Sequence, residues 1–286
     1  MIVFLASPVL NVVSAVGLAT VLAALLGFII TVVFRFFAVE SNEKEEAILE
    51  LLPGVNCGGC GYSGCQGYAA ALADGSDTNL GKCTAGGKDT MDSLSEYFGQ
   101  VPATFIPKLA VVRCQGSNEQ VRVRYQYEGS VNCHTANGLF GGPGTCSHGC
   151  LGFGDCVRAC EYDAIEVKNG VAIVNPDKCI ACGACVEACP RALISIEPKF
   201  QDLTIVRCMN PDAGKDVRKV CDIGCIGCTL CVKKCPEQCI SMVDKRAVID
   251  QDRCTQCGTC ASVCPTHAIT QGLKQGKASA AAAAKA

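Results

Sequence analysis

The sequence predicts an α+β protein in which one N-terminal membrane-spanning helix is followed by a small four-cysteine domain and two tandem cysteine-rich modules. Two observations support this expectation. Residues 2–34 contain no charged side chain, and all 25 cysteines of the 286-residue chain come after them. Residues 146–189 then recur at 221–264 with the same cysteine spacing, 75 positions later. A repeat at a fixed period indicates that each copy is one structural unit.

The N-terminal apolar run is long enough to cross a membrane. It covers 33 positions without a charge, whereas a bilayer-spanning helix needs about 20 residues. A secretory signal peptide would begin with a basic region and have a shorter apolar stretch. Basic residues mark the cytoplasmic side of a membrane helix, and here Arg35 and the charged stretch at 40–46 follow the run. We therefore expect residues 1–39 to be a single-pass anchor in the lipid bilayer of the cytoplasmic membrane, with the other domains in the cytosol.

Residues 40–100 are expected to form a small domain around one metal centre. Four cysteines follow the spacing C-x2-C-x4-C-x17-C, and the glycines between them let the backbone approach a bound group closely. Many zinc sites also use C-x2-C, but the iron–sulfur spacing of the repeats that follow favours a [4Fe–4S] cluster. The predicted ligands are Cys57, Cys60, Cys65 and Cys83.

Residues 101–130 are expected to be a linker and strand segment, because valine and tyrosine alternate there with polar residues, as in a half-buried strand. The alternating residues are Val121, Val123, Tyr125 and Tyr127.

Residues 131–200 and 201–270 are expected to be two ferredoxin-like modules. Three blocks of the repeat have the spacing C-x2-C-x2-C-x3-C, and Pro190 maps onto Pro265. This is the spacing of bacterial ferredoxins, in which three cysteines hold one [4Fe–4S] cluster and the fourth binds the other cluster. Three regular ligand sets follow, namely Cys179, Cys182, Cys185 with Cys160; Cys225, Cys228, Cys231 with Cys264; and Cys254, Cys257, Cys260 with Cys235.

One site of the first module is irregular, since Phe153 stands where the second module has Cys228. A phenylalanine cannot bind iron, so another thiol is needed. Cys146 lies a few residues upstream and is the expected replacement, with Cys133 as the alternative. The predicted set is Cys146, Cys150, Cys156 and Cys189, which brings the expected number of clusters to five.

Five cysteines are left over: Cys114, Cys133, Cys208, Cys221 and Cys239. One interpretation is that they are buried thiols, which pack as small hydrophobic side chains. The other is a sixth cluster on Cys114, Cys133, Cys208 and Cys221, since Cys133 maps onto Cys208 at the same interval of 75. The spacing alone does not separate these two interpretations.

The composition fits a redox protein without a nucleotide site of its own. A net charge of −2 gives no basic surface for nucleic acid. Cysteines at metal-ligand spacing fit a reducing compartment better than a secreted disulfide scaffold. The chain has no Walker loop, its glycines follow no βαβ pattern, and its three histidines are isolated. No catalytic residue is expected, and residues 271–286, which are rich in alanine, are expected to be a disordered tail.

Two stretches resemble a known family, namely LLPGVNCGGCGYSGCQGYA at 51–69 and CLGFGDCVRAC at 150–160. With the apolar run and the two modules, they resemble the B subunits of Rnf-type ion-translocating electron-transport complexes (ferredoxin:NAD+ oxidoreductases), in the long form with two ferredoxin modules. The resemblance implies an iron–sulfur protein that accepts electrons from reduced ferredoxin and relays them toward NAD+ reduction coupled to Na+ or H+ export. It also implies membrane-embedded partner subunits and a flavin/NAD-binding subunit. The chain departs from the family at Glu161, usually proline, and at Cys239, usually alanine.

Two other functions compete with this one. The first is an electron-transfer module that keeps a redox-sensing iron–sulfur regulator reduced, and the second is a membrane scaffold structured by zinc. Zinc thiolates are colourless, so visible absorption separates the scaffold from both iron–sulfur functions. NADH formation in the presence of partner subunits separates the two iron–sulfur functions from each other.

Overall fold

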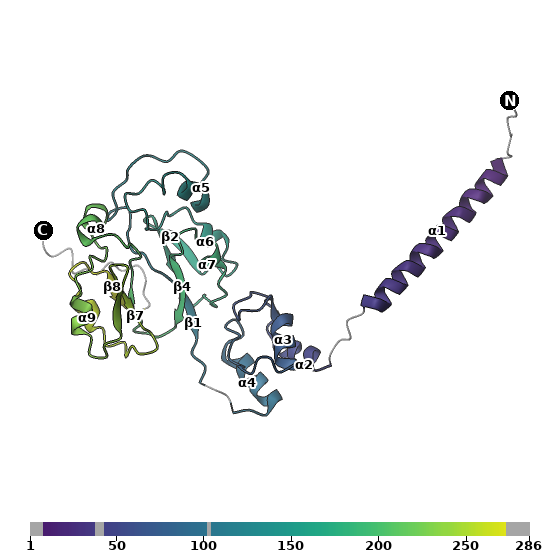
Figure 1. Cartoon of the computed structure of the whole chain (residues 1–286), viewed down its shortest axis with the longest axis horizontal. Coiled ribbons are helices and arrows are strands. Elements are labelled where there is room, and N and C mark those ends of the chain that lie inside the picture. The colour runs from purple at the N-terminus through teal and green to yellow at the C-terminus, as the bar shows by residue number, and fades with distance from the viewer. Residues whose placement is uncertain (1–7, 38–42, 102–103, 273–286) are drawn as a thin grey trace. The chain divides into compact units, whose positions relative to one another are not determined.

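The computed structural model describes residues 8–37, 43–101 and 104–272 (Figure 1). Residues 1–7 and 38–39 of the expected anchor, and residues 273–286 of the expected tail, lie outside the described residues. The chain divides into two compact units, Met1–Glu46 and Ala47–Ala286. All of the cysteines belong to the second unit.

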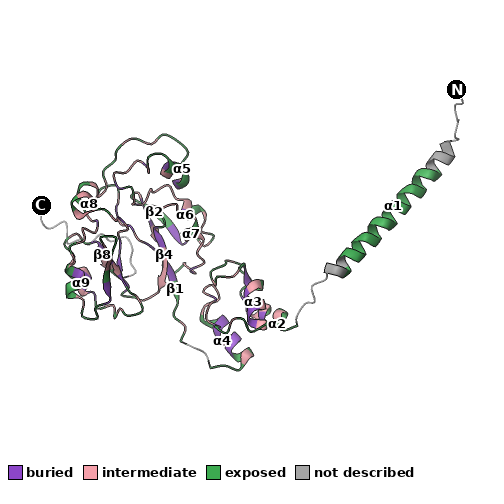
Figure 2. Cartoon of the chain, viewed as in Figure 1, coloured by how far each residue is buried: buried purple, intermediate pink, exposed green. Residues whose placement is uncertain are grey.

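The first unit contains one long apolar helix, α1 (Pro8–Phe37). Proline suits the first turn of a helix, because the N–H that it lacks would have no partner there. Val13–Val33 has a mean hydropathy of 2.6 and is long and apolar enough to cross a membrane. At 1.5 Å per residue these 21 residues span about 31 Å, close to the thickness of a bilayer's hydrocarbon core. Their side chains are exposed on every face of the helix (Figure 2).

A small helical domain follows, in which α2 is Glu43–Leu51, α3 is Cys65–Ala73 and α4 is Gly87–Phe98. Ile48, Tyr68 and Leu94 are at most 1 % exposed and form the apolar core with Cys65 and Cys83. The core thus lies directly against two of the cysteines expected to bind metal.

The first module has two antiparallel strand pairs with two short helices between them (Figure 1). One pair is a hairpin, β2–β3, and the other joins the two ends of the module, β1–β4. Its elements are β1 (Lys108–Val112), α5 (Cys133–Gly138), α6 (Asp155–Arg158), β2 (Ile165–Lys168), β3 (Val171–Val174), α7 (Ala184–Glu187) and β4 (Ile194–Pro198). Residues 101–130, expected as a linker and strand segment, thus contain the strand β1 of this module.

The second module repeats this architecture. Strands β6 and β7 form the hairpin, and β5 pairs with β8 as β1 pairs with β4. Its elements are β5 (Thr204–Val206), α8 (Gly214–Val220), α9 (Leu230–Lys234), β6 (Ile240–Val243), β7 (Arg246–Ile249), α10 (Thr259–Ser262) and β8 (Ile269–Gln271). In both modules every strand contributes at least one buried residue (Figure 2), and the buried apolar side chains pack against cysteines.

The two hairpin turns explain why these short strands pair in register. Asn169 and Gly170 have φ angles of 50° and 81°, and Asp244 and Lys245 have 46° and 60°. Two consecutive positive φ angles are the signature of a type I′ turn, whose twist matches that of the flanking strands.

The modules differ by an insertion in the first one. Cys114 follows β1 by two residues, and Cys208 follows β5 by two residues, each within the sequence Val-Arg-Cys. Cys146 comes 32 positions after Cys114, whereas Cys221 comes only 13 positions after Cys208. The additional residues lie between Cys114 and Cys146 and form the long loop that contains α5 (Figure 1). This loop, residues 115–145, is the insertion. Most of the alternating residues expected as a strand lie in this insertion, where Val121 and Val123 make only isolated β-bridges.

Candidate metal centres

Five cavities in the second unit are each lined by at least four cysteines. Four of these cavities gather the expected sets, and each fourth cysteine comes from the segment that the spacing assigns to it. The four are lined by Cys57, Cys60, Cys65 and Cys83; by Cys160, Cys179, Cys182 and Cys185; by Cys225, Cys228, Cys231 and Cys264; and by Cys235, Cys254, Cys257 and Cys260, the last together with Cys239. The fifth is lined by Cys133, Cys150, Cys156 and Cys189.

Backbone N–H groups are directed at the sulfurs of the regular sites. Ala110 donates to the Sγ atom of Cys179 at 3.3 Å, and Ala268 donates to that of Cys264 at 3.3 Å. Hydrogen bonds to an ionised sulfur stabilise the charged form and tune a bound metal centre. Burial raises the pKa of the Cys185 thiol to about 12, so the free thiol is protonated, whereas metal coordination removes that proton.

The four-cysteine domain holds its ligands by local capping. Asn56 accepts a hydrogen bond from the backbone N–H of Cys65 at 2.9 Å, and Gly86 donates to the Cys83 sulfur at 3.4 Å. Gly64 has a φ of 147° and lies against the Asn56 side chain, where a methyl group would come within 2.9 Å of the amide oxygen. A larger residue at Gly64 would therefore displace the loop that presents Cys65.

The cavity at the irregular site is lined by a cysteine of the insertion. Cys133 lines the cavity with Cys150, Cys156 and Cys189, whereas Cys146, the residue expected there, is not among the lining residues. Phe153 is not among them either, and its ring lies 5.2 Å from that of Tyr127 in the insertion. The cavity therefore favours the alternative ligand over the expected one: the helix α5 brings Cys133, and not Cys146, to the cavity where Phe153 occupies the position equivalent to Cys228.

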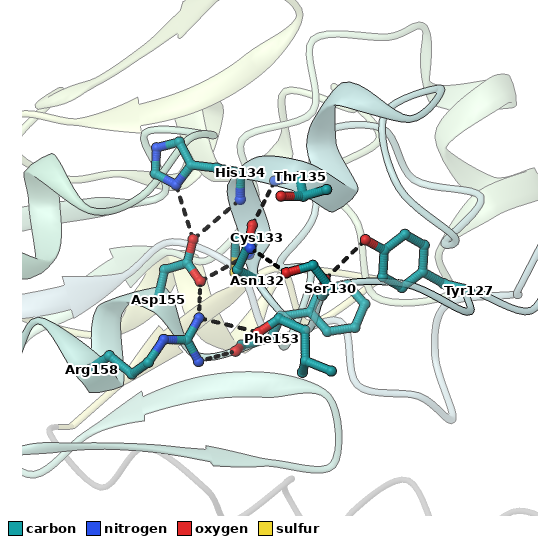
Figure 3. Close-up of polar contacts among 10 residues, drawn as sticks. Tyr127, Ser130, Asn132, Cys133, His134, Thr135, Phe153, Asp155 and Arg158 are labelled. Atoms are coloured by element: carbon teal, nitrogen blue, oxygen red, sulfur yellow. Dashed lines mark hydrogen bonds and ion pairs between the residues drawn. The ribbon is translucent and has the colours of Figure 1, made fainter.

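Asp155 fastens Cys133 to this cavity (Figure 3). One carboxylate oxygen accepts the backbone N–H of Cys133 at 2.9 Å, and the other accepts the N–H of His134 at 3.2 Å and contacts its ring Nδ1 at 2.9 Å. Arg158 forms an ion pair with the same carboxylate. Although burial by itself would raise it, the hydrogen bonds from Cys133 and His134 hold the pKa of Asp155 below its usual value. Asp155 directly precedes Cys156, so one side chain links two cysteines of the cavity.

The loop before Cys133 is itself ordered by polar contacts (Figure 3). Asn132 is the N-cap of α5, and its side chain accepts the N–H of Thr135 at 2.7 Å and donates to the Ser130 hydroxyl at 2.8 Å. An asparagine N-cap satisfies one of the unpaired N–H groups at a helix start. Tyr127 donates to the Ser130 carbonyl at 2.9 Å. Hydrogen bonds from Tyr127 and Asn132 to Ser130 therefore hold the residues just before Cys133 in place.

Cys146 lies instead among the left-over cysteines. A methyl group on Gly149 would be 3.5 Å from the Cys146 sulfur and 3.8 Å from the Cys114 sulfur. Burial raises the pKa of the Cys221 thiol to about 11, and the nearby Cys146 and Cys208 add to this. The expected extra set of Cys114, Cys133, Cys208 and Cys221 is therefore brought together except for Cys133, whose place is taken by Cys146.

A second sequence repeat, with an interval other than 75, indicates this arrangement. Val-Arg-Cys occurs at 112–114 and at 206–208, an interval of 94. It pairs Cys114 with Cys208 and leaves Cys133 inside the insertion, without an equivalent in the second module. The match of Cys133 to Cys208 is thus accidental.

The residues fit an iron–sulfur cluster better than a single ion. The candidate donors at each of the five cavities are thiols, which are the soft ligands that zinc and iron–sulfur clusters take. Among the residues that the structure describes, no three His, Cys, Asp or Glu side chains gather closely enough to hold one ion. The cysteines instead surround a cavity, as thiolates bound to the corners of a larger group do.

Family models match the cysteine-rich parts of the chain. The "4Fe-4S binding domain" model matches residues 172–195 and 247–270, and a second model of the same description matches 224–238. The model described as "Putative Fe-S cluster" matches residues 52–85. These matches confirm the expected α+β class with ferredoxin-like modules and the expected [4Fe–4S] cofactor type.

Relatives of the chain resemble it along most of its length. It is 37 % identical to the B subunit of the Na(+)-translocating ferredoxin:NAD(+) oxidoreductase complex of Acetobacterium woodii, over 93 % of this chain and 79 % of the relative. It is 35 % identical to the B subunit of the ion-translocating oxidoreductase complex of Methanosarcina acetivorans, over 85 % and 92 %. The proton-translocating counterpart of Clostridium ljungdahlii is 35 % identical, over 87 % and 89 %. The chain therefore belongs to the family of B subunits of ion-translocating oxidoreductase complexes, as a membrane-associated protein of iron–sulfur electron transfer.

Proposed function

We propose that this chain accepts electrons from reduced ferredoxin and delivers them, through its iron–sulfur sites, to membrane-embedded and flavin/NAD-binding partner subunits. The relay would serve NAD+ reduction coupled to the export of Na+ or H+. The observation that supports this most strongly is the gathering of cysteines, four or more, at each of five cavities in one compact unit. When bound, [4Fe–4S] clusters supply one-electron steps at low potential.

The five ligand sets that we propose follow the cavities. Four are the regular sets predicted from the spacing, and the fifth uses Cys133 with Cys150, Cys156 and Cys189. The chain's own part is to hold, space and insulate the clusters.

Two of these sites adjoin each other across a domain boundary. Thr84 follows Cys83 and donates from its hydroxyl to the Ala181 carbonyl at 3.3 Å. A methyl group on Gly59 would lie 3.2 Å from that carbonyl and 3.4 Å from the Cα atom of Cys182. Glycine at position 59 therefore permits a close approach of the four-cysteine domain to the first module. This contact supports a direct electron route between the two sites.

The energy available from such a relay suffices for ion export. Low-potential ferredoxin clusters lie near −400 mV, and a fall of about 100–200 mV for two electrons releases about 5–9 kcal/mol. Moving one charge against about 150 mV costs about 3.5 kcal/mol. One or two ions per electron pair is therefore the ceiling for the complex.

The anchor fits this role. The span Val13–Val33 would cross the bilayer once, and Arg35 follows it. Because basic residues favour the cytoplasmic side, the cysteine-containing unit would face the cytosol, where ferredoxin and NAD+ are available.

The test is NADH formation in membranes that contain the complete complex. With wild-type chain and reduced ferredoxin, NADH should form. Membranes with Cys182→Ser in this chain should retain the variant protein and yet form NADH many-fold more slowly, since that site belongs to the first module and adjoins the four-cysteine domain. Undiminished NADH formation by the variant, or by membranes that lack this chain, would overturn the proposal. Reduction of the chain by ferredoxin without NADH formation in the wild-type complex would favour the regulator-reducing alternative.

A further inference from the structure

Four of the remaining cysteines come together where the two modules meet. The five proposed ligand sets use 20 of the 25 cysteines, and Cys239 lies beside Cys235, with 3.5 Å between their sulfurs. We propose that the other four hold a sixth [4Fe–4S] cluster, a site that rests on the proposed iron–sulfur function. The four are Cys114, Cys146, Cys208 and Cys221.

The distances around two glycines locate three of these sulfurs. A methyl group on Gly116 would lie 3.6 Å from the Cys221 sulfur and 3.7 Å from the Cys114 sulfur. One on Gly149 would lie 3.5 Å from the Cys146 sulfur and 3.8 Å from the Cys114 sulfur. Cys114 therefore lies near both Cys221 and Cys146, with Gly116 beside the first pair and Gly149 beside the second. All four of these cysteines are free thiols in the structure.

Cys208 completes the group from the second module. Its thiol lies near Cys146 and Cys225, and Asn210, two residues further along the chain, brings its amide nitrogen to 3.6 Å from the Cys146 sulfur. Cys146 and Cys208 are likewise both neighbours of Cys221. Each of the four cysteines thus has at least two of the others as neighbours.

The site has an internal two-fold pattern. Cys114 and Cys208 each follow the first strand of their module, and Cys146 and Cys221 are each four positions before a cavity-lining cysteine. Each module therefore contributes the same two positions, and neither module has four ligands alone. A cluster shared in this way would join the modules covalently through metal.

The insertion of the first module closes the site on one side. Val121 makes an antiparallel bridge with Cys221, and Asp222 donates its N–H to the Gln120 carbonyl at 3.2 Å. The Thr145 hydroxyl also donates to the Val220 carbonyl at 3.1 Å. These contacts hold Cys221 against the first module.

Two buried polar side chains suit an anionic group. Asn210 is 2 % exposed, and its amide nitrogen lies 3.6 Å from the Cys146 sulfur as a donor. Arg207 is 8 % exposed, donates to the Cys114 carbonyl at 3.5 Å, and has a buried Nε atom without a hydrogen-bond partner in the described part of the chain. A buried guanidinium is costly unless a negative charge lies nearby. On binding, each of the four thiols loses its proton, and a [4Fe–4S] cluster with four thiolates is negatively charged overall.

The site lies between two of the five cavities. The backbone N–H of Cys150 donates to the Cys114 sulfur at 3.3 Å, and that of Cys225 donates to the Cys208 sulfur. Cys150 lines the irregular cavity of the first module, and Cys225 lines one cavity of the second. One hydrogen bond therefore separates a ligand of the sixth site from a ligand of each neighbouring site. A cluster there would connect the two modules into one continuous electron path.

The test is the iron content and the spectrum of the full chain, purified in detergent and reconstituted anaerobically with iron and sulfide. Six cubanes require about 24 irons per chain, and five require about 20. Wild type should hold about 24, with Mössbauer spectra that show only [4Fe–4S] iron. Cys146→Ala and Cys221→Ala should each lose about four irons and the same EPR component, and the double variant should lose no more than either one. Ser241→Ala, at an exposed position that lines none of the five cavities, is the control and should keep all of them.

Combination with Cys133→Ala separates the two sites. Cys133→Ala with Cys221→Ala should lose about eight irons, because the residues belong to different clusters. Three results would each overturn the sixth site: a wild type with about 20 irons, a wild type with stoichiometric zinc, or a double variant whose iron loss equals the sum of the losses of Cys146→Ala and Cys221→Ala. Should single variants fail to fold, the wild-type iron count still decides. Loss of the sixth site alone would leave a chain that ferredoxin reduces, whereas failure of the proposed function would leave a loaded chain that ferredoxin does not reduce.

Discussion

Replacing Cys133 tests the assignment of the irregular site, where structure and sequence interval disagree. Cys133→Ser leaves Cys150, Cys156 and Cys189 at the cavity. Serine is a harder and poorer ligand for iron than thiolate, so one corner of the cube loses its protein ligand. We expect a loss of between about one iron, if a three-iron cluster remains, and about four, if the whole cluster leaves, out of about 24.

The assay is EPR of the oxidised, reconstituted full chain together with iron and sulfide analysis. A three-iron cluster should give a new signal of about one spin per chain, absent from wild type. Cys146→Ser should instead affect a different cluster component, the one that Cys221→Ser also removes. An unchanged Cys133→Ser protein, with the new signal appearing in Cys146→Ser, would refute the reasoning from the cavity.

A rescue variant tests the same assignment by restoring a cysteine ligand at the irregular site. The backbone around Phe153 follows that around Cys228, since Gly152 and Gly227 have φ angles of 74° and 67°. Phe153→Cys in the Cys133→Ser protein should therefore restore the iron and remove the three-iron signal. The ring contact with Tyr127 would be lost, so stability is expected to fall even as the cluster returns. Rescue would show that Cys133 substitutes for the missing cysteine of the repeat, and a persistent three-iron signal would speak against that substitution.

The remaining predictions concern the support of the clusters by the fold. Asp155→Ala should make the irregular cluster labile, measured as faster iron release to a chelator with the other clusters retained, because the carboxylate holds the N–H groups of Cys133 and His134 at the start of α5; equal release rates would contradict this. Leu94→Ala should destabilise the four-cysteine domain by about 2–5 kcal/mol, since Leu94 is 0 % exposed, and a loss of unfolding free energy below about 1 kcal/mol in denaturant titration would count against that core. Deleting residues 1–37 should release a brown protein from the membrane fraction with its iron content intact, as all cysteines lie in the second unit; a colourless product would show that the anchor is part of the cluster fold.

Local spacing was sufficient wherever the ligands of a site belong to one repeat. A tight C-x2-C-x2-C turn places three sulfurs on one side of a cavity whatever surrounds it, and the two-fold arrangement of a ferredoxin supplies the fourth. The type I′ turn at Asn169-Gly170 was predictable for the same reason, because these two adjacent residues determine the backbone conformation of the turn.

The spacing was insufficient where the chain departs from the repeat. Cys133 reaches its cavity only because Asn132 starts a helix there and Asp155, 22 residues later, fixes that helix. Neither contact has a periodic signature. Within the expected linker and strand segment, alternation pointed to residues 121–127, whereas the strand formed is β1. Its partner β4 lies more than 80 residues away in sequence, and pairings of such separation depend on the folded module rather than on local pattern.

Anaerobic titration of the purified full chain with reduced ferredoxin tests the central claim most directly. The chain should be brown, its absorbance should bleach as ferredoxin is oxidised, and EPR signals of reduced [4Fe–4S] clusters should grow in proportion to the electrons taken up. An iron-loaded chain that reduced ferredoxin neither bleaches nor converts to the EPR-active state would contradict its assignment as the point of electron input.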